Sequence, residues 1–173
     1  MSGFTERMIG AATLDGAIIE EIEHDRSGTG QALAVVALAA AAAGVGMWAY
    51  GGIGLLLSGM VAAVLGWAIW AGLIWLIGTR VLPESGTDAN WSELARTTGF
   101  AQAPGVLRLF GFVPLIGGLV VLVANLWMVV SMVVAVRHAL DYQSTWRAVL
   151  VVLIGWLANA LLFAALTGFS WNA

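Results

Sequence analysis

The chain has 173 residues, of which 61% are hydrophobic and only 10% are charged, and its net charge is −3. Soluble domains carry about 25% charged residues, so this composition excludes an ordinary soluble domain, and the lack of a basic run excludes nucleic acid as a partner. Cysteine is absent, which excludes disulfides, thiolate metal sites and cysteine nucleophiles. The composition instead predicts an integral membrane protein surrounded by membrane lipids.

Residues 1–30 form a polar segment that is predicted to be helical in part, with interruptions at Gly10 and Gly16 and a break at residues 27–30. Six acidic residues and two arginines precede the first apolar run, which is not the pattern of a cleavable signal peptide. We expect an acidic cytoplasmic helix here, followed by a membrane domain over residues 31–173.

Two long apolar runs come next. The first extends from Ala32 to about Tyr50 and is rich in alanine, and the second extends from Gly54 to Gly78 without a charged residue. About 20 apolar residues of α-helix cross the roughly 30 Å hydrocarbon core of a bilayer. Both runs are therefore predicted to be membrane spans, joined by a tight turn at residues 50–52.

A polar loop over residues 80–103 is predicted to hold a short helix from Trp91 to Thr98. The helix follows residues 87–90, whose aspartate and asparagine side chains can cap its N-terminus. Gly99 is expected to end the helix.

A short apolar segment from Pro104 to Val113 contains Arg108 and is followed by Pro114. A charged residue at the centre of a span costs about 2.5–3.5 kcal/mol, whereas each large apolar residue contributes only about 0.3–0.6 kcal/mol, so this helix would insert poorly alone. Arg108, the candidate functional charge within the membrane, is expected either to extend its guanidinium to the cytoplasmic interface, which we favour, or to pair within the bundle. Apolar runs from Leu119 to Val136 and from Ala148 to Leu166 predict two more spans.

The arginines determine the expected orientation. They lie before the first span, in the loop of residues 80–103 and in the turn of residues 137–147, whereas the turn at residues 50–52 has none. Under the positive-inside rule the arginine-bearing segments are cytoplasmic, so residues 104–136 cross an even number of times, or form a re-entrant loop plus a surface helix. We predict an all-α polytopic membrane bundle of about five transmembrane helices, the third short and Pro-interrupted. The expected orientation has the N-terminus in the cytoplasm and the C-terminus outside.

Several segments, taken in their order along the chain, carry a resemblance to a known family: residues 20–25, 28–32, 99–104, 125–127, 134–140 and 146–148. Together they resemble the bacterial branch of the Yip1-domain family, over nearly the whole chain. The resemblance implies a small five-span membrane protein, and the bacterial branch implies that it lies in a bacterial inner membrane. Eukaryotic members act as scaffolds in vesicle trafficking and contact Rab GTPases or one another, so the resemblance implies protein–protein contact rather than an activity.

An acidic cluster near the N-terminus is the candidate cytoplasmic docking surface and consists of Glu20, Glu21, Glu23, His24 and Asp25. The Glu-x-x-His spacing within it occurs in di-iron bundles, but those need two such motifs and further carboxylates, and only one copy is present. We therefore predict no metal site and interpret the cluster first as a solvated acidic face. Docking of a basic partner is the second interpretation.

Six residues are candidate helix–helix or partner contacts. Small residues recur at every fourth position of the second span, a pattern that lets helices approach closely, and two asparagines lie near the middle of the last two spans, where an amide needs a hydrogen-bond partner. The set is Gly54, Ser58, Ala62, Gly66, Asn125 and Asn159. Packing within the chain is the first interpretation; self-association and, for the asparagines, a permeation path are the alternatives.

No nucleophile–base pair, phosphate-binding glycine loop or haem ligand pair occurs in the sequence, so we predict no catalytic residue and no cofactor. The protein is interpreted as a non-enzymatic scaffold or accessory subunit that contacts other membrane proteins or itself. The alternative is a transporter or channel for a small neutral or lipidic substrate, suggested by the Pro114 interruption, the two asparagines and Arg108. A water-accessible cavity reaching Asn125 favours this alternative, whereas tight packing around both asparagines removes it.

Overall fold

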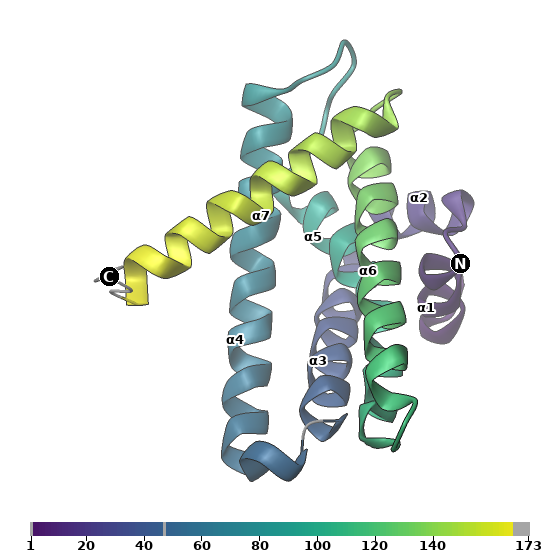
Figure 1. The fold of residues 1–173 in the computed structure, drawn as a ribbon. Helices are drawn as coiled ribbons and strands as arrows, with labels where there is room; N and C mark the ends of the chain where they lie inside the picture. Colours follow the sequence, from purple (N-terminus) through teal and green to yellow (C-terminus); the bar gives the residue numbers. More distant parts are fainter. Residues whose placement is uncertain (1, 47, 168–173) are drawn as a thin grey trace.

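The computed structural model describes residues 2–46 and 48–167, and every regular element within them is a helix (Figure 1). Four helices are long and apolar enough to cross a membrane, and they comprise Arg26–Gly46, Gly52–Val81, Gly117–Ala139 and Thr145–Leu162. The predicted all-α membrane bundle is therefore confirmed. The remaining predicted span, the third, is not among these four helices.

The first two spans are α3 (Thr29–Gly46) and α4 (Trp48–Leu76). The predicted turn between them is a kink inside α4 at Gly52, whose φ of 58° lies in the left-handed region that favours glycine. A π-helical turn, η2 (Ile77–Val81), continues α4. The hydroxyl of Tyr142, in the turn before the last helix, lies 2.9 Å from the carbonyl oxygen of Gly78 and so secures this end of α4.

The third predicted span is a 3-10 helix, η3 (Ala103–Phe112), which contains ten residues. At about 2 Å per residue it is roughly 20 Å long, shorter than the hydrocarbon core of about 30 Å. The chain turns after it, and α6 begins at Gly117 and ends at Ala139. The sequence correctly indicates a short segment that stops before Pro114, but this segment is not a full transmembrane helix.

The direction of η3 follows from its neighbours. Along η3 its contacts on α3 advance from Ala39 to Gly46, so these two helices run in the same direction. Its contacts on α6 instead recede from Met128 to Val121, so α6 runs back in the opposite direction. η3 and α6 therefore run in opposite directions, so the chain returns toward the side from which η3 starts. This path agrees with the expectation that residues 80 and 137 lie on the same side of the membrane.

Two helices of the polar N-terminal segment, α1 (Phe4–Ala12) and α2 (Gly16–His24), pack against α5 and α6 (Figure 1). Gly10 was expected to interrupt a helix, but it lies inside α1. A Cβ at this position would lie 2.6 Å from the Ile18 side chain, so Gly10 permits the close approach of α1 and α2. The described part of the N-terminal segment is therefore packed on the bundle, while the domain boundary at residue 30 stays a prediction.

Helix α5 (Trp91–Phe100) begins where the sequence predicts. The Asn90 side chain caps the N-terminus of this helix by accepting hydrogen bonds from the backbone N–H groups of Ser92 and Glu93. Gly99 does not end the helix. A Cβ at Gly99 would lie 2.8 Å from the Cβ of Ala32, so the glycine allows α5 to pack directly on α3.

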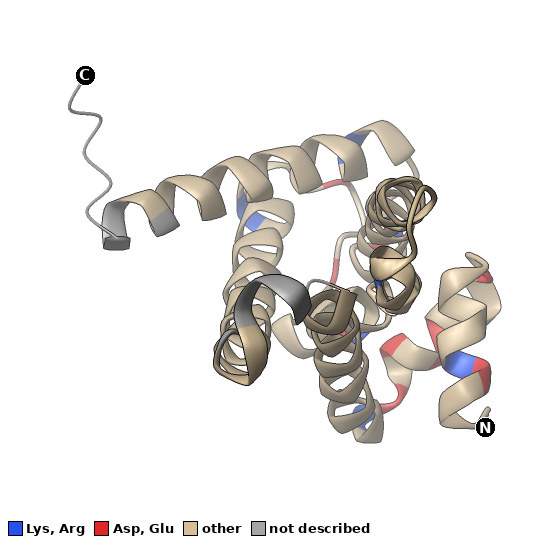
Figure 2. Ribbon diagram, turned by 60° about the horizontal axis from the view of Figure 1, so that its bottom comes forward, with Lys and Arg blue, Asp and Glu red and all other residues tan. Residues whose placement is uncertain are grey.

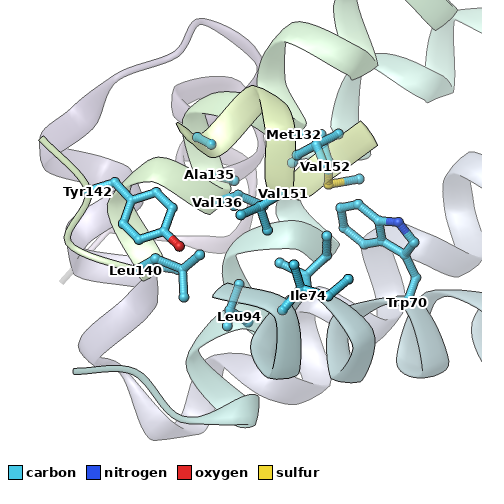
Figure 3. Close-up of a cluster of buried hydrophobic side chains, with 14 residues drawn as sticks. Trp70, Ile74, Leu94, Met132, Ala135, Val136, Leu140, Tyr142, Val151 and Val152 are labelled. Atoms are coloured by element: carbon cyan, nitrogen blue, oxygen red, sulfur yellow. The ribbon is translucent and has the colours of Figure 1, made fainter. Parts of the chain in front are cut away.

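A hydrophobic core joins α4, α5, α6 and α7 (Thr145–Thr167), as Figure 3 shows. Ile74 of α4, Leu94 of α5, Val136 of α6 and Val151 of α7 have no exposed surface. These four side chains come from helices far apart in the sequence, so their burial fixes the positions of the helices around them.

Candidate functional site

A cavity of about 600 Å³ lies within the bundle and is partly open to the outside. Its wall is formed by α3, α4, α6, α7 and the η3 segment. Ligand-binding cavities commonly have volumes of about 300–1,000 Å³ and a mainly apolar lining. The cavity therefore has the size and character of a binding site for a small molecule.

Small residues on two helices make room for this cavity. They are Ala40, Ala43 and Gly44 on α3, and Gly59, Ala63 and Gly66 on α4. A Cβ added at Gly59 or at Gly66 would meet no atom within 4 Å, so both glycines face open space. Large side chains at these positions would fill the cavity without colliding with another helix at their Cβ atoms.

Four side chains with polar groups line the cavity: Gln102, Arg108, Asn125 and Asn159. They come from the start of η3, η3 itself, α6 and α7, so the fold brings together residues that the sequence leaves separate. Within the described part of the chain, neither asparagine amide forms a hydrogen bond. The cavity reaches Asn125 and is partly open, while its access to water, the condition for the transporter or channel alternative, stays a prediction.

Arg108 lies between η3 and α3 and is half-buried. Its Nε donates a hydrogen bond to the Gly105 carbonyl oxygen at 3.1 Å, and one terminal nitrogen donates to the Ala39 carbonyl oxygen at 3.0 Å. Of the two arrangements considered for this side chain, the structure has the one inside the bundle rather than the favoured extension to the interface. No carboxylate among residues 2–46 and 48–167 forms an ion pair with it.

Three tryptophans, Trp67, Trp70 and Trp156, also line the cavity. The Trp67 indole donates a hydrogen bond to the Thr98 hydroxyl at 3.3 Å. The Nε1 of Trp70 is buried and has no hydrogen-bond partner in the described structure. A buried donor without an acceptor is unusual in folded proteins, and here it belongs to a residue of the cavity wall.

The small residues that recur at every fourth position of α4 do not all lie in the same environment. Gly66 lines the cavity, whereas Gly54, Ser58 and Ala62 are exposed. The Ser58 hydroxyl donates a hydrogen bond to the Gly54 carbonyl oxygen of its own helix at 2.9 Å. Gly54 and Ala62 are exposed among the described residues, so the predicted packing of these small residues against another helix stays a prediction there.

The acidic cluster at residues 20–25 is not a uniformly solvated face. Arg7 is 1% exposed, and its guanidinium lies 2.9 Å from a carboxylate oxygen of Glu21 and 2.7 Å from one of Asp25. Hydrogen bonds from Ser2 and Arg7 lower the pKa of Glu21 to about 2, and bonds from Ser27 and Arg7 do the same for Asp25. Figure 2 shows the charged residues of α1 and α2 gathered at this side of the bundle.

A second buried arginine ties the cluster to α5. The Nε of Arg96 donates to the carbonyl oxygens of Ile22 and Glu23, each at 3.2 Å, and a terminal nitrogen also donates to the Glu23 carbonyl oxygen. The Glu23 side chain is itself buried. Only Glu20 and His24 of the cluster are fully exposed and free to meet a partner protein.

Burial, together with the nearby Asp141 carboxylate, raises the pKa of Glu23 to about 7 from an ordinary value near 4.5. The folded state therefore binds more protons than the unfolded state between pH 4.5 and 7, so the Glu23 contribution to stability falls as pH rises through this interval. Replacing Glu23 with glutamine should raise the stability by about 1 kcal/mol at pH 8 and leave it unchanged near pH 4.5. Thermal unfolding in detergent at both pH values measures this. A difference of the same size at both values contradicts the prediction, and Glu20→Gln, which alters an exposed neighbour, is the control.

Four long apolar helices define the chain as a polytopic helical membrane protein. A family model described as the Yip1 domain matches residues 15–166, which is most of the chain and includes every element from α2 through α6. The protein belongs to the Yip1 domain family. No curated protein and no solved structure matches it.

Proposed function

We propose that this membrane protein binds a lipidic molecule in the cavity of its helical bundle, and that binding or transport of this molecule is its function. The observation that carries the proposal is the cavity of about 600 Å³ with polar groups from separate helices in an otherwise apolar wall. An apolar molecule with one polar end fits such a wall, because its chain contacts the small and aromatic residues while its polar end meets Gln102, Arg108 and Asn125.

The shape of the cavity supports a chain-like ligand over a compact solute. Beyond the kink at Gly52, its lining on α4 extends from Leu56 to Trp70, which is about 21 Å along the helix axis at 1.5 Å per residue. The cavity is also partly open, so a molecule already dissolved in the bilayer could enter from the side. Among the described residues no carboxylate lines the cavity, which argues against a pathway for a cation.

A scaffold role is the second candidate, and two exposed surfaces support it. Glu20 and His24 could meet a basic partner, and the exposed face of Gly54 and Ala62 could pack against a second copy or another membrane protein. Stable co-purification of a partner in mild detergent, lost on Gly54→Leu but not on Gly59→Leu, would place this role ahead of lipid binding.

The orientation proposed for the chain places α1, α2, the loop of residues 80–103 and the turn of residues 137–147 in the cytoplasm of a bacterial cell. The arginines of these segments support it through the positive-inside rule. The antiparallel pairing of η3 with α6 agrees with this path. The proposed C-terminal side rests on α7 crossing once, and residues 168–173 lie outside the described residues.

Lipid binding can be tested by photolabelling the full chain in vesicles with a phospholipid that carries a diazirine at the end of one acyl chain. Mass spectrometry then locates the labelled residues. We expect labels on cavity residues such as Met128 and Met132, in addition to those that bulk lipid leaves on exposed residues such as Leu65 and Leu157. Labels confined to the exposed residues would rule out occupation of the cavity.

A further inference from the structure

We propose that the cavity is selective for a membrane lipid with an anionic oxygen-bearing head group, and that Arg108 is the residue that binds this group. The inference rests on the proposed function and adds the chemical class of the ligand. Three observations support it: the cavity wall has an unpaired positive charge, it has hydrogen-bond donors that no described residue uses, and most of its remaining surface is apolar.

The charge of the wall is uncompensated. Arg108 alone is charged among the described residues that line the cavity, and both of its hydrogen bonds go to neutral carbonyl oxygens, those of Gly105 and Ala39. Charged groups inside membrane proteins are commonly paired, because an isolated charge in an apolar medium is costly. An anion in the cavity supplies the partner that the described part of the chain does not.

The guanidinium also keeps donors for such an anion. It has five N–H groups in a planar fork that matches the oxygens of a phosphate or a carboxylate. Two of them are used by the bonds to Gly105 and Ala39. The remaining N–H groups, all on the terminal nitrogens, form no hydrogen bond within the described structure, and Arg108 is part of the cavity wall.

The other polar groups of the wall are compatible with an anion and unsuited to a cation. Gln102, Asn125 and Asn159 each carry an NH₂ group that can donate to an oxygen. No aspartate or glutamate contributes to the lining. A head group rich in acceptor oxygens therefore satisfies more of this wall than any cationic head group.

The apolar part of the cavity lining indicates that the anion is the head group of a lipid rather than a free ion. Alanine, glycine, methionine and tryptophan side chains form most of the lining, over about four turns of α4. An inorganic phosphate would leave this surface uncovered. A lipid covers it with an acyl chain and so adds the hydrophobic contribution of that contact to the charge interaction.

The test compares two lipids that share their acyl chains and differ only in the head group, namely phosphatidic acid and diacylglycerol. Binding of each to the purified full chain is measured by native mass spectrometry over a series of lipid concentrations. The wild-type chain should bind phosphatidic acid about tenfold more tightly than diacylglycerol, because charge-assisted hydrogen bonds to Arg108 form only with the phosphate. This comparison needs no variant, so it does not depend on the folding of a mutant.

Substitutions at Arg108 then test whether this residue is the source of the preference for phosphatidic acid. Arg108→Gln should bring the preference for phosphatidic acid over diacylglycerol close to one, because it removes the charge. Arg108→Lys should retain part of the preference, because the charge remains without the planar fork. Arg147→Gln is the control, since Arg147 lies in an exposed ion pair with Glu84 away from the cavity. Thermal unfolding without added lipid verifies that each variant is folded.

The outcomes separate the two proposals. Failure of both lipids to bind would overturn the proposed function together with this inference. Equal binding of both lipids to the wild-type chain would overturn the head-group inference and leave lipid binding standing. Inorganic phosphate is added as a competitor in a third arm: displacement of phosphatidic acid at millimolar phosphate would mean that the site recognises a free anion, and would overturn the assignment to a lipid.

Discussion

Replacement of Arg96 with alanine is expected to lower the free energy of unfolding by about 3–5 kcal/mol. The Arg96 guanidinium donates to the carbonyl oxygens of Ile22 and Glu23, and its side chain is buried between α2 and α5. Without it these two carbonyl groups stay buried without donors, and an unsatisfied buried polar group costs about 1–3 kcal/mol. The loss of the packed side chain adds to this cost.

The same substitution at Arg147 is the matched control. Arg147 also bonds a carbonyl oxygen, that of Pro83, and a carboxylate, that of Glu84, but it is exposed. Exposed ion pairs contribute about 0–1 kcal/mol, so Arg147→Ala should have a small effect. Urea or thermal unfolding of both variants in detergent, with proteolysis of residues 1–30 as a second readout, measures the difference. Equal stability of the two variants would mean that Arg96 does not hold the N-terminal helices.

Filling the cavity should abolish photolabelling inside it. Substitution of Gly59 and Gly66 by leucine places two branched side chains where a Cβ meets no atom within 4 Å. We expect labelling of Met128 and Met132 to fall at least tenfold, because the acyl chain loses its space on α4. The stability should not fall, since leucine is favoured over glycine in a helix by about 0.8–1 kcal/mol at each position.

Gly54→Leu provides the control for this pair on the same helix. Its Cβ also meets no atom within 4 Å, but Gly54 does not line the cavity. The control should change helix propensity to a similar extent and leave cavity labelling intact. A loss of labelling in Gly54→Leu as large as in the double variant would show that the effect comes from the membrane surface of α4 and not from the cavity.

The long elements of this fold are predictable from the sequence because each is a continuous apolar run. The second span, the cap at Asn90 and the short segment that stops before Pro114 all appear where composition and capping chemistry indicate them. The roles of Gly10 and Gly99 were not predictable. Both allow two helices to touch, and a sequence that shows only a glycine cannot distinguish a helix break from a close contact.

The candidate site was predictable only in its parts. Arg108, Asn125 and Asn159 stand out in the sequence as polar residues in apolar segments, but their convergence depends on how η3, α6 and α7 pack. Gln102 could not be recognised as a cavity residue from the sequence, because glutamine is common in polar loops. The Arg7 ion pairs were missed for a similar reason: a single arginine among acidic residues reveals neither its burial nor its partners.

The central claim, that a lipid occupies the bundle, is tested most directly by native mass spectrometry of the protein taken from cell membranes with no lipid added. We predict that the wild-type chain carries one tightly retained lipid per protein molecule and that the chain with leucine at positions 59 and 66 carries none. A wild-type chain that is free of lipid, or a filled variant that retains the same lipid, would contradict the account.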